Sequence, residues 1–158
     1  MSLESVRADL AARAPDLRIL ETEASTATVA LAAAAHGVEP GRIAKTLSLR
    51  VGERVVLVVA RGDARLDNRK LKQCFGAKPR MLDAAEVSAL TGHPVGGVCP
   101  FGLASPLPVY CDVSLRAFEE VLPAAGSLHS AVRIGTERLA ALTGAEWVDV
   151  CQDPAAVA

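Results

Sequence analysis

A chain of 158 residues is long enough for one domain with a substantial core, and 51% apolar with 22% charged residues is typical of a folded globular protein. Aromatic residues make up only 3% of the chain and the net charge is −1, which argues against a base-stacking sheet and against general nucleic-acid binding. The sequence has neither a signal-peptide-like segment nor an apolar run of transmembrane length, so we expect a cytoplasmic protein that does not interact with membranes.

The predicted elements follow one another without a linker, as one domain over residues 1–158. In chain order the sequence predicts a helix over 2–14, a strand over 17–20, a helix from Ser25 or Thr26 to 36, strands over 43–51 and 55–60, helices over 66–75 and 83–91, strands over 107–115 and 129–135, a helix over 136–143 and a strand over 146–150. The 55–60 segment is apolar without alternation, which predicts a central strand covered on both faces.

These strands occur both in hairpin order and separated by helices. The fold class is therefore predicted to be α/β (α+β), a single domain with a mixed, partly antiparallel β-sheet flanked by helices.

Four cysteines form no CxxC pair and have no histidine at zinc-like spacing, so no metal and no cofactor are expected. We interpret Cys74, Cys111 and Cys151 as small buried apolar residues. Cys99 is considered separately because it lies in a glycine-rich loop.

Positive charge is concentrated in residues 61–80, which carry seven Lys or Arg against two Asp, a balance of +5 in a chain of net charge −1. Such asymmetry is typical of a face that meets a polyanion, and equally of a solvated helix flank. Charge alone does not choose between the two.

The segment TGHPVGGVCPFG, residues 91–102, combines four glycines with two prolines and is therefore predicted to be a loop. It carries no charged side chain apart from a possible charge on His93, unlike a solvated connector. Gly96, Gly97 and Val98 offer successive backbone N–H groups that a small anion or carbonyl could approach. We interpret the loop as stripped of side chains to wrap a small substrate.

Lys45 stands out in the strand RIAKTLSLRV because alternate residues of a strand share a face. It falls in the apolar set with Ile43 and Leu47, whereas Thr46 and Ser48 fall on the opposite side. Two interpretations are open: the side chain extends to water from the strand's beginning, or it holds its charge at the lip of a cleft.

The run AKTL around Lys45, the glycine loop about fifty residues later and the segment GSLHSAVRIG together resemble the YbaK/ProX family of aminoacyl-tRNA deacylases. Its pattern G-x-x-x-G-G-x-x-P-x-G matches Gly92, Gly96, Gly97, Pro100 and Gly102. The family is related to the editing domain inserted in bacterial prolyl-tRNA synthetases, and the resemblance covers about residues 20–150.

The resemblance implies a trans-acting editing hydrolase that removes a wrong amino acid, such as Cys or Ala, from a mischarged tRNA of prolyl type. The implied partners are the 3′ end and acceptor stem of aminoacyl-tRNA, with a prolyl-tRNA synthetase as a further candidate. Ester hydrolysis passes through an oxyanion that needs preorganised donors, which the loop can supply.

With this resemblance, Lys45, Gly96 and Gly97 are the expected catalytic residues, and Lys45 has two candidate roles, holding the terminal adenosine's phosphate or ribose, or steadying the reacting carbonyl. The expected substrate-binding residues are Thr46, Gly92, His93, Val98, Cys99, Pro100, Phe101, Gly102, Asp112, His129 and Ser130. The expected tRNA contacts, from the basic segment, are Arg65, Arg69, Lys70 and Lys72.

Two alternatives stay open at this point. The thiol of Cys99 could act as a nucleophile, although its neighbours are apolar and no base partner is evident; we favour a small residue of the pocket wall. The domain could also bind tRNA or an aminoacyl nucleotide as a regulatory module without turning it over, because fold does not imply activity.

Overall fold

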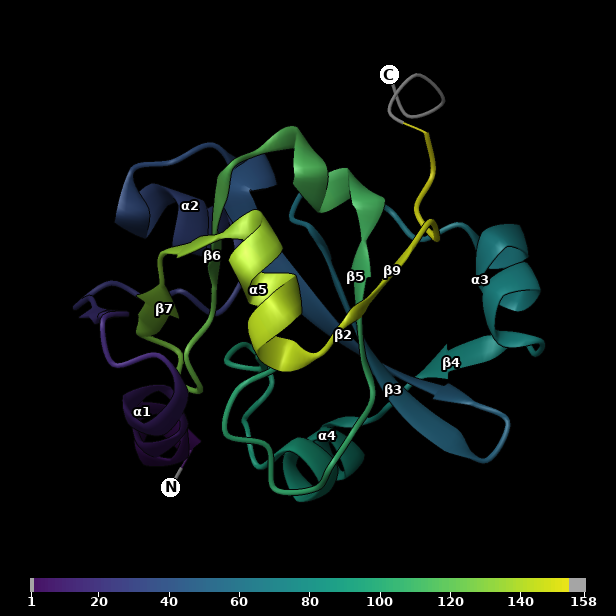
Figure 1. Ribbon diagram of the computed structural model, residues 1–158, viewed down its shortest axis with the longest axis horizontal. Helices are drawn as coiled ribbons and strands as arrows, with labels where there is room; N and C mark the ends of the chain where they lie inside the picture. The colour runs from purple at the N-terminus through teal and green to yellow at the C-terminus, as the bar shows by residue number, and fades with distance from the viewer. Residues whose placement is uncertain (1, 154–158) are drawn as a thin grey trace.

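An apolar hairpin forms the centre of the molecule. Strands β2 (Ile43–Val51) and β3 (Arg54–Arg61) pair antiparallel across a turn at Gly52 and Glu53. Residues 56–60 are completely buried, which confirms the prediction of a central strand covered on both faces. In the computed structural model, which describes residues 2–153, this hairpin organises the sheet shown in Figure 1.

The main sheet is mixed, as expected. On one side β3 pairs parallel with β5 (Val109–Asp112), which in turn pairs parallel with β9 (Glu146–Val148). On the other side the edge of β2 meets two different strands. It pairs parallel with β6 (Glu120–Pro123) near its beginning and antiparallel with β4 (Pro79–Met81) near its end.

Three short strands complete the architecture. β8 (Ile134–Gly135) pairs antiparallel with β6, and β1 (Ile19–Glu21) forms a separate two-stranded sheet with β7 (Ser130–Val132). The single α/β domain predicted from the sequence is therefore confirmed.

Helices cover both faces of the main sheet. Within the described residues they are α1 (Ser2–Arg13), α2 (Val29–His36), α3 (Asn68–Phe75), α4 (Ala84–Thr91) and α5 (Thr136–Thr143), with short 3₁₀ turns at Pro40–Arg42 and Val113–Ala117. Leu71 of α3 packs on the face of β2 that carries Leu49. Val6 of α1 and Leu139 of α5 pack on the other face, with Leu57. None of the helices within residues 2–153 could span a membrane.

Several predicted boundaries were wrong for local reasons. Helix α2 begins at Val29, not at Ser25 or Thr26, because the Thr28 hydroxyl accepts the N–H of Leu31, whereas the Thr26 N–H donates to Leu128 O. The strand expected over 107–115 ends at Asp112, whose carboxylate caps a 3₁₀ turn.

Other strands differ from the prediction because tertiary pairing defines them. The strand expected over 129–135 is divided into β7 and β8, which belong to different sheets, and the strand expected over 146–150 ends at Val148. The strands β4 and β6 were not predicted because each is short and contains a proline.

The polar side of β2 is also buried. Ala44 and Ser48 are almost fully covered, and Ala44 belongs to the largest core cluster. The small residues on this side therefore reflect close packing of the strand on both faces, not a solvated face.

Candidate active site

A cavity of about 360 Å³ lies along the open edge of β2. β6 pairs with β2 only at Ile43 and Ala44, and β4 only at residues 49–51, so a gap separates the two partners. Residues 43–48 form one wall of the cavity, and the remaining lining comes from residues 26–32, 81–87, 95–98 and 122–131. This volume lies within the range typical of small-molecule sites.

The lining is mostly apolar, with a few polar groups. Lys45 is its one cation, and no Asp, Glu or His of residues 2–153 belongs to it. The Oγ1 atoms of Thr26 and Thr46 are buried without a hydrogen-bond partner among the described residues. Ser130 is fully buried, and its hydroxyl shares a hydrogen bond of 2.6 Å with the Ser127 hydroxyl.

Lys45 lines the cavity, and its side chain binds the basic segment. Lys45 lies opposite Ala60 on the face of β2 that carries Leu49, half-buried, and its ammonium donates a hydrogen bond to the Ala64 carbonyl. Burial lowers the pKa of Lys45, opposed in part by nearby Asp63. Lys45 thus lies in the register expected from the sequence, with its charge directed towards residues 63–65.

The middle of the glycine loop, residues 95–98, borders the cavity. Gly96 and Val98 line it, and no described residue accepts a hydrogen bond from either N–H group. The N–H of Gly97 donates instead to Pro94 O at 2.9 Å, so the expected run of three free donors is interrupted. Two amides that flank Gly97 are left for a ligand.

Contacts within the chain itself leave no room for a side chain at Gly96 and Gly97. A Cβ on Gly97 would lie 2.9 Å from the backbone N of Ser127, and one on Gly96 would lie 3.0 Å from the Ala27 carbonyl. Gly96 also has φ of +92°, which favours glycine. The interpretation that a substrate alone excluded side chains was incomplete, because neighbouring backbone segments exclude them as well.

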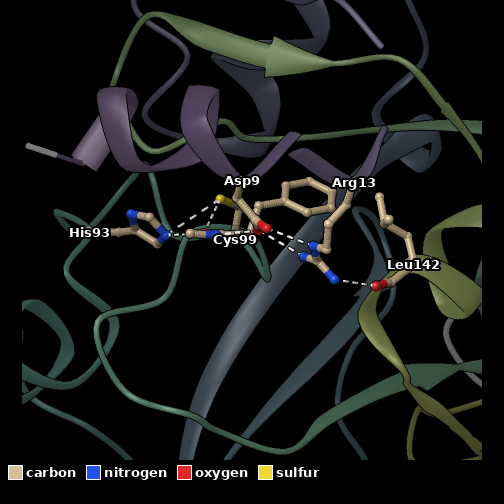
Figure 2. A network of polar contacts seen from close by, with 7 residues as sticks. Asp9, Arg13, His93, Cys99 and Leu142 are labelled. Atoms are coloured by element: carbon tan, nitrogen blue, oxygen red, sulfur yellow. Dashed lines mark hydrogen bonds and ion pairs between the residues drawn. The ribbon is translucent and has the colours of Figure 1, made fainter. Parts of the chain in front are cut away.

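The two ends of the loop, His93 and residues 99–102, pack against α1, on the side shown in Figure 2. The Nε2–H of His93 donates to Phe101 O at 2.7 Å, and its Nδ1 accepts from the Ser2 hydroxyl. The N–H of Gly102 donates to the Asp9 carboxylate at 2.8 Å. His93 and Phe101 are fully buried, and burial lowers the pKa of His93, which favours the neutral ring.

The same network extends along α1. Asp9 binds Arg13 at 2.6 Å, and Arg13 donates in turn to Leu142 O at the end of α5 (Figure 2). Of the predicted substrate-binding residues, Gly92, His93, Cys99, Pro100, Phe101 and Gly102 do not line the β2-edge cavity. They fix the loop to the domain instead.

Cys99 lies in the core between this loop and α1. Its side chain is fully buried, and its sulfur lies 3.6 Å from His93 Nε2, a neighbour that the sequence did not reveal, and 3.7 Å from Phe101 O. That Nε2 carries the proton donated to Phe101 O, and burial raises the pKa of Cys99 to about 12. A thiol in such surroundings forms little thiolate at neutral pH, which argues against nucleophilic catalysis. Cys111 and Cys151 are buried as expected, whereas Cys74 is exposed, a difference from the prediction.

Asp112 and His129 lie outside the cavity. The Asp112 carboxylate accepts the N–H groups of Ser114 and Val150 and lines a second cavity of about 410 Å³ beside β9. His129 is exposed, and its Nδ1–H donates to Ala24 O at 3.2 Å. Of the predicted residues, the β2-edge cavity unites Lys45, Thr46, Gly96, Val98 and Ser130.

Of the four expected tRNA contacts, all except Lys70 are exposed. Arg65, Arg69 and Lys72 have exposed side chains, and no described acidic residue forms an ion pair with them. Lys70 instead binds Asp149 at 3.0 Å and Cys151 O at 2.8 Å. Three of the four expected tRNA contacts are therefore exposed cations without an acidic partner among residues 2–153, and Arg65 directly follows Ala64, the acceptor of Lys45.

Sequence reasoning did not identify Thr26 as a cavity residue. It treated Thr26 as a candidate first residue of the second helix, and no local signal distinguishes the two roles. Only the bond from its N–H to Leu128 O, 2.6 Å long, places it beside Gly96 and Ser130 in the cavity wall.

Comparison with known families gives a match over most of the chain. A family model described as an aminoacyl-tRNA editing domain matches residues 23–142. The uncharacterized protein YwhH of Bacillus subtilis strain 168 is 48% identical over 155 residues, which are 97% of this chain and 99% of the relative.

More distant relatives carry functional names. A protein of Enterococcus faecalis named as a candidate Cys-tRNA(Pro)/Cys-tRNA(Cys) deacylase, EbsC, is 30% identical over 117 residues, 72% of this chain and 71% of the relative. A proline–tRNA ligase of Desulfovibrio desulfuricans is 33% identical over 116 residues, 72% of this chain and 20% of the ligase.

A solved structure has the same fold throughout. The crystal structure of a candidate trans-editing enzyme for prolyl tRNA synthetase superposes with a TM-score of 0.89 at 36% identity, covering 96% of this chain and 98% of the other.

Proposed function

Because the chain belongs to the aminoacyl-tRNA editing domain family, we propose that it is a trans-acting hydrolase that deacylates a mischarged tRNA. The proposed substrate is a prolyl-type tRNA that carries a small wrong amino acid such as Cys or Ala. The names of the relatives support this choice, since EbsC is named as a candidate Cys-tRNA(Pro)/Cys-tRNA(Cys) deacylase and the superposing structure as a candidate trans-editing enzyme for prolyl tRNA synthetase.

The observation that carries the proposal is the β2-edge cavity. It brings free loop amides, at Gly96 and Val98, into the same small apolar space as the stem of Lys45. Amides held by a packed loop need no reorganisation when charge develops on a substrate oxygen, which is the requirement for oxyanion stabilisation.

In the proposed reaction a water molecule attacks the ester carbonyl carbon and the carbonyl oxygen becomes an oxyanion. The N–H groups of Gly96 and Val98 donate to that oxygen. The tetrahedral intermediate then breaks its bond to the ribose oxygen, which leaves with a proton, and the free amino acid departs as a carboxylate with release of the other proton. An aminoacyl ester is already reactive, so positioning and oxyanion stabilisation account for catalysis without a nucleophilic side chain.

For Lys45, the geometry favours the anion-holding role over the carbonyl-steadying role. Its ammonium is bound to Ala64, in the basic segment, while Lys45 itself is one of the residues that line the cavity. A charge placed there meets the phosphate next to the terminal adenosine, with Arg65, Arg69 and Lys72 extending the cationic surface towards the acceptor stem.

An editing enzyme is needed because a synthetase pocket has a limited ability to discriminate between similar amino acids. A synthetase pocket rejects an amino acid that is smaller by one methylene by only about 1–3 kcal/mol, so errors need a second site. A cavity of about 360 Å³ is large enough to hold a small aminoacyl group.

The test is a panel of tRNAs charged with cognate and wrong amino acids, incubated with catalytic amounts of the pure protein. Multiple turnovers on Cys-tRNA(Pro) or Ala-tRNA(Pro), with Pro-tRNA(Pro) spared, support the proposal. Binding at one equivalent without turnover would instead support a non-catalytic tRNA-binding module. No activity and no binding across the panel would refute both.

A further inference from the structure

The backbone of Thr46 is an unpaired piece of β-strand edge inside the cavity. The two-residue turn at Gly52–Glu53 makes Val51 and Arg54 a hydrogen-bonded pair, and the alternation of an antiparallel ladder then turns the backbone groups of every second residue away from β3. Thr46 is one of these outward-facing residues.

One hydrogen bond on the outer side of β2 confirms this alternation. The Ser48 carbonyl, two residues further on, accepts the N–H of Leu82 at 3.2 Å on the outer side of β2. Arg50 pairs with Arg80 of β4 on that side, and Ala44 pairs with Pro123 of β6. Thr46 lies between these partners, and no described residue forms a hydrogen bond with its N–H or C=O.

Within residues 2–153, the cavity has no acidic side chain in its lining. An aminoacyl ester carries an α-amino group, yet no carboxylate of residues 2–153 lines the space, and the one charged side chain there, Lys45, has the same sign as an ammonium. Uncharged acceptors remain for such a group: the unpartnered hydroxyls of Thr26 and Thr46, and the free carbonyl of Thr46, which is the one that lies beside a free N–H on the strand edge.

We infer that the aminoacyl group binds as a one-residue β-strand on the edge of β2. This inference rests on the proposed function. The N–H and C=O of an extended residue point to the same side, so the α-amino group can donate to the Thr46 carbonyl while the ester carbonyl accepts from the Thr46 N–H. The other side of the ester carbonyl oxygen stays accessible to the N–H groups of Gly96 and Val98.

This arrangement explains recognition that does not depend on the amino-acid side chain. The bonds engage only atoms that all aminoacyl esters share. An acylated α-nitrogen, by contrast, has fewer N–H donors and carries a bulky group towards the strand, so a peptidyl or N-acetyl ester should be excluded.

A direct test uses hydrogen exchange of backbone amides, followed by NMR, with 3′-alanylamino-3′-deoxyadenosine as a probe that cannot be hydrolysed. The expected result is at least tenfold slower exchange of the Thr46 amide on saturation. The Leu47 amide, which faces β3, is the internal control and should not change. The N-acetyl form of the probe should bind at least tenfold more weakly.

A matched pair of variants tests the same bond in the reaction. Thr46→Val keeps the backbone and removes the hydroxyl, and its backbone-ester counterpart, with α-hydroxyisovaleric acid at position 46, differs only in having oxygen in place of N–H. The ester form should deacylate Ala-tRNA(Pro) about tenfold more slowly than Thr46→Val, as expected for one hydrogen bond, with both folded by thermal melting.

The outcomes separate this inference from the proposed function. Probe binding that leaves the exchange of Thr46 unchanged, equal rates for the matched pair, or no binding of the probe at millimolar concentration would overturn the strand-edge inference. Protection of Thr46 by the probe in a protein that hydrolyses no mischarged tRNA would support the inference and refute the hydrolase.

Discussion

Replacing Lys45 by methionine separates the charge of this side chain from its packing. The stem of Lys45 lies on the apolar face of β2, where a methionine of similar length can replace it, while the ammonium that binds Ala64 is lost. A charge-assisted hydrogen bond contributes about 1.5–3 kcal/mol, so kcat/KM on mischarged tRNA should fall about 10- to 100-fold.

The stability of the variant should change little. The substitution removes the bond to Ala64 and, at the same time, the cost of burying the ammonium, which lowers the pKa of Lys45. The two effects oppose each other. We expect Tm to stay within about 2–4 °C of the parent, the shift that about 1 kcal/mol produces in a chain of this size.

The salt dependence of deacylation distinguishes the two roles of Lys45. If the ammonium binds a phosphate, Lys45→Met should make the slope of log kcat/KM against log salt shallower by about 0.7, the value for one contact to a single strand. Hydrolysis of an aminoacyl-adenosine without phosphate should be almost unaffected. An equal loss of kcat on both substrates with an unchanged slope would refute the reasoning and assign Lys45 to the carbonyl.

The pH profile gives an independent check. Because burial lowers the pKa of Lys45, its charge is complete below that lowered pKa and is lost as the pH rises through it, earlier than for an exposed lysine. The KM of the parent for tRNA should therefore rise at alkaline pH, whereas that of Lys45→Met should stay flat, after the spontaneous hydrolysis of the ester is subtracted.

Three further predictions concern the loop and the basic segment. Val98→Pro removes a free loop N–H and should lower kcat about 10²- to 10³-fold, whereas Val98→Ala keeps the N–H and should retain most of the rate; similar rates for two folded variants would contradict an oxyanion role. Reversal of Arg69 and Lys72 to Glu should raise KM for tRNA and flatten its salt dependence without affecting aminoacyl-adenosine, and an equal loss on both substrates would argue against a tRNA contact. Cys99→Ala should lower Tm because it removes a fully buried sulfur, yet leave most hydrolysis in place, with or without a chelator; a trapped acyl adduct on the parent thiol would reverse this conclusion.

Local patterns determined the elements whose signals lie within a few residues. The continuous apolar run at 55–60 predicted the central strand, because only a strand covered on both faces can bury every residue. The pair Asp83 and Glu86 predicted the start of α4, where both capping bonds are formed. The alternation of β2 gave the register of Lys45, since the period of a strand fixes the face of each side chain.

The candidate site could be predicted only in part. The glycine loop and Lys45 were recognised together through a family resemblance, but the loop was treated as one unit. The structure divides it, with Gly96 and Val98 on the cavity and His93 and Cys99 buried against α1. No local signal marks this division.

Only the tertiary structure decided which residues of the glycine loop face the cavity and which pack against α1, because the contacts that fix them come from distant parts of the chain. The Ala27 carbonyl and the backbone of Ser127 confine Gly96 and Gly97 in the middle of the loop, and Asp9 holds the end of the loop through the N–H of Gly102. The open edge of β2 has the same origin. Residues 43–51 specify a strand, but whether Thr46 finds a partner depends on where β4 and β6 end, and those ends are set by packing rather than by the sequence of β2.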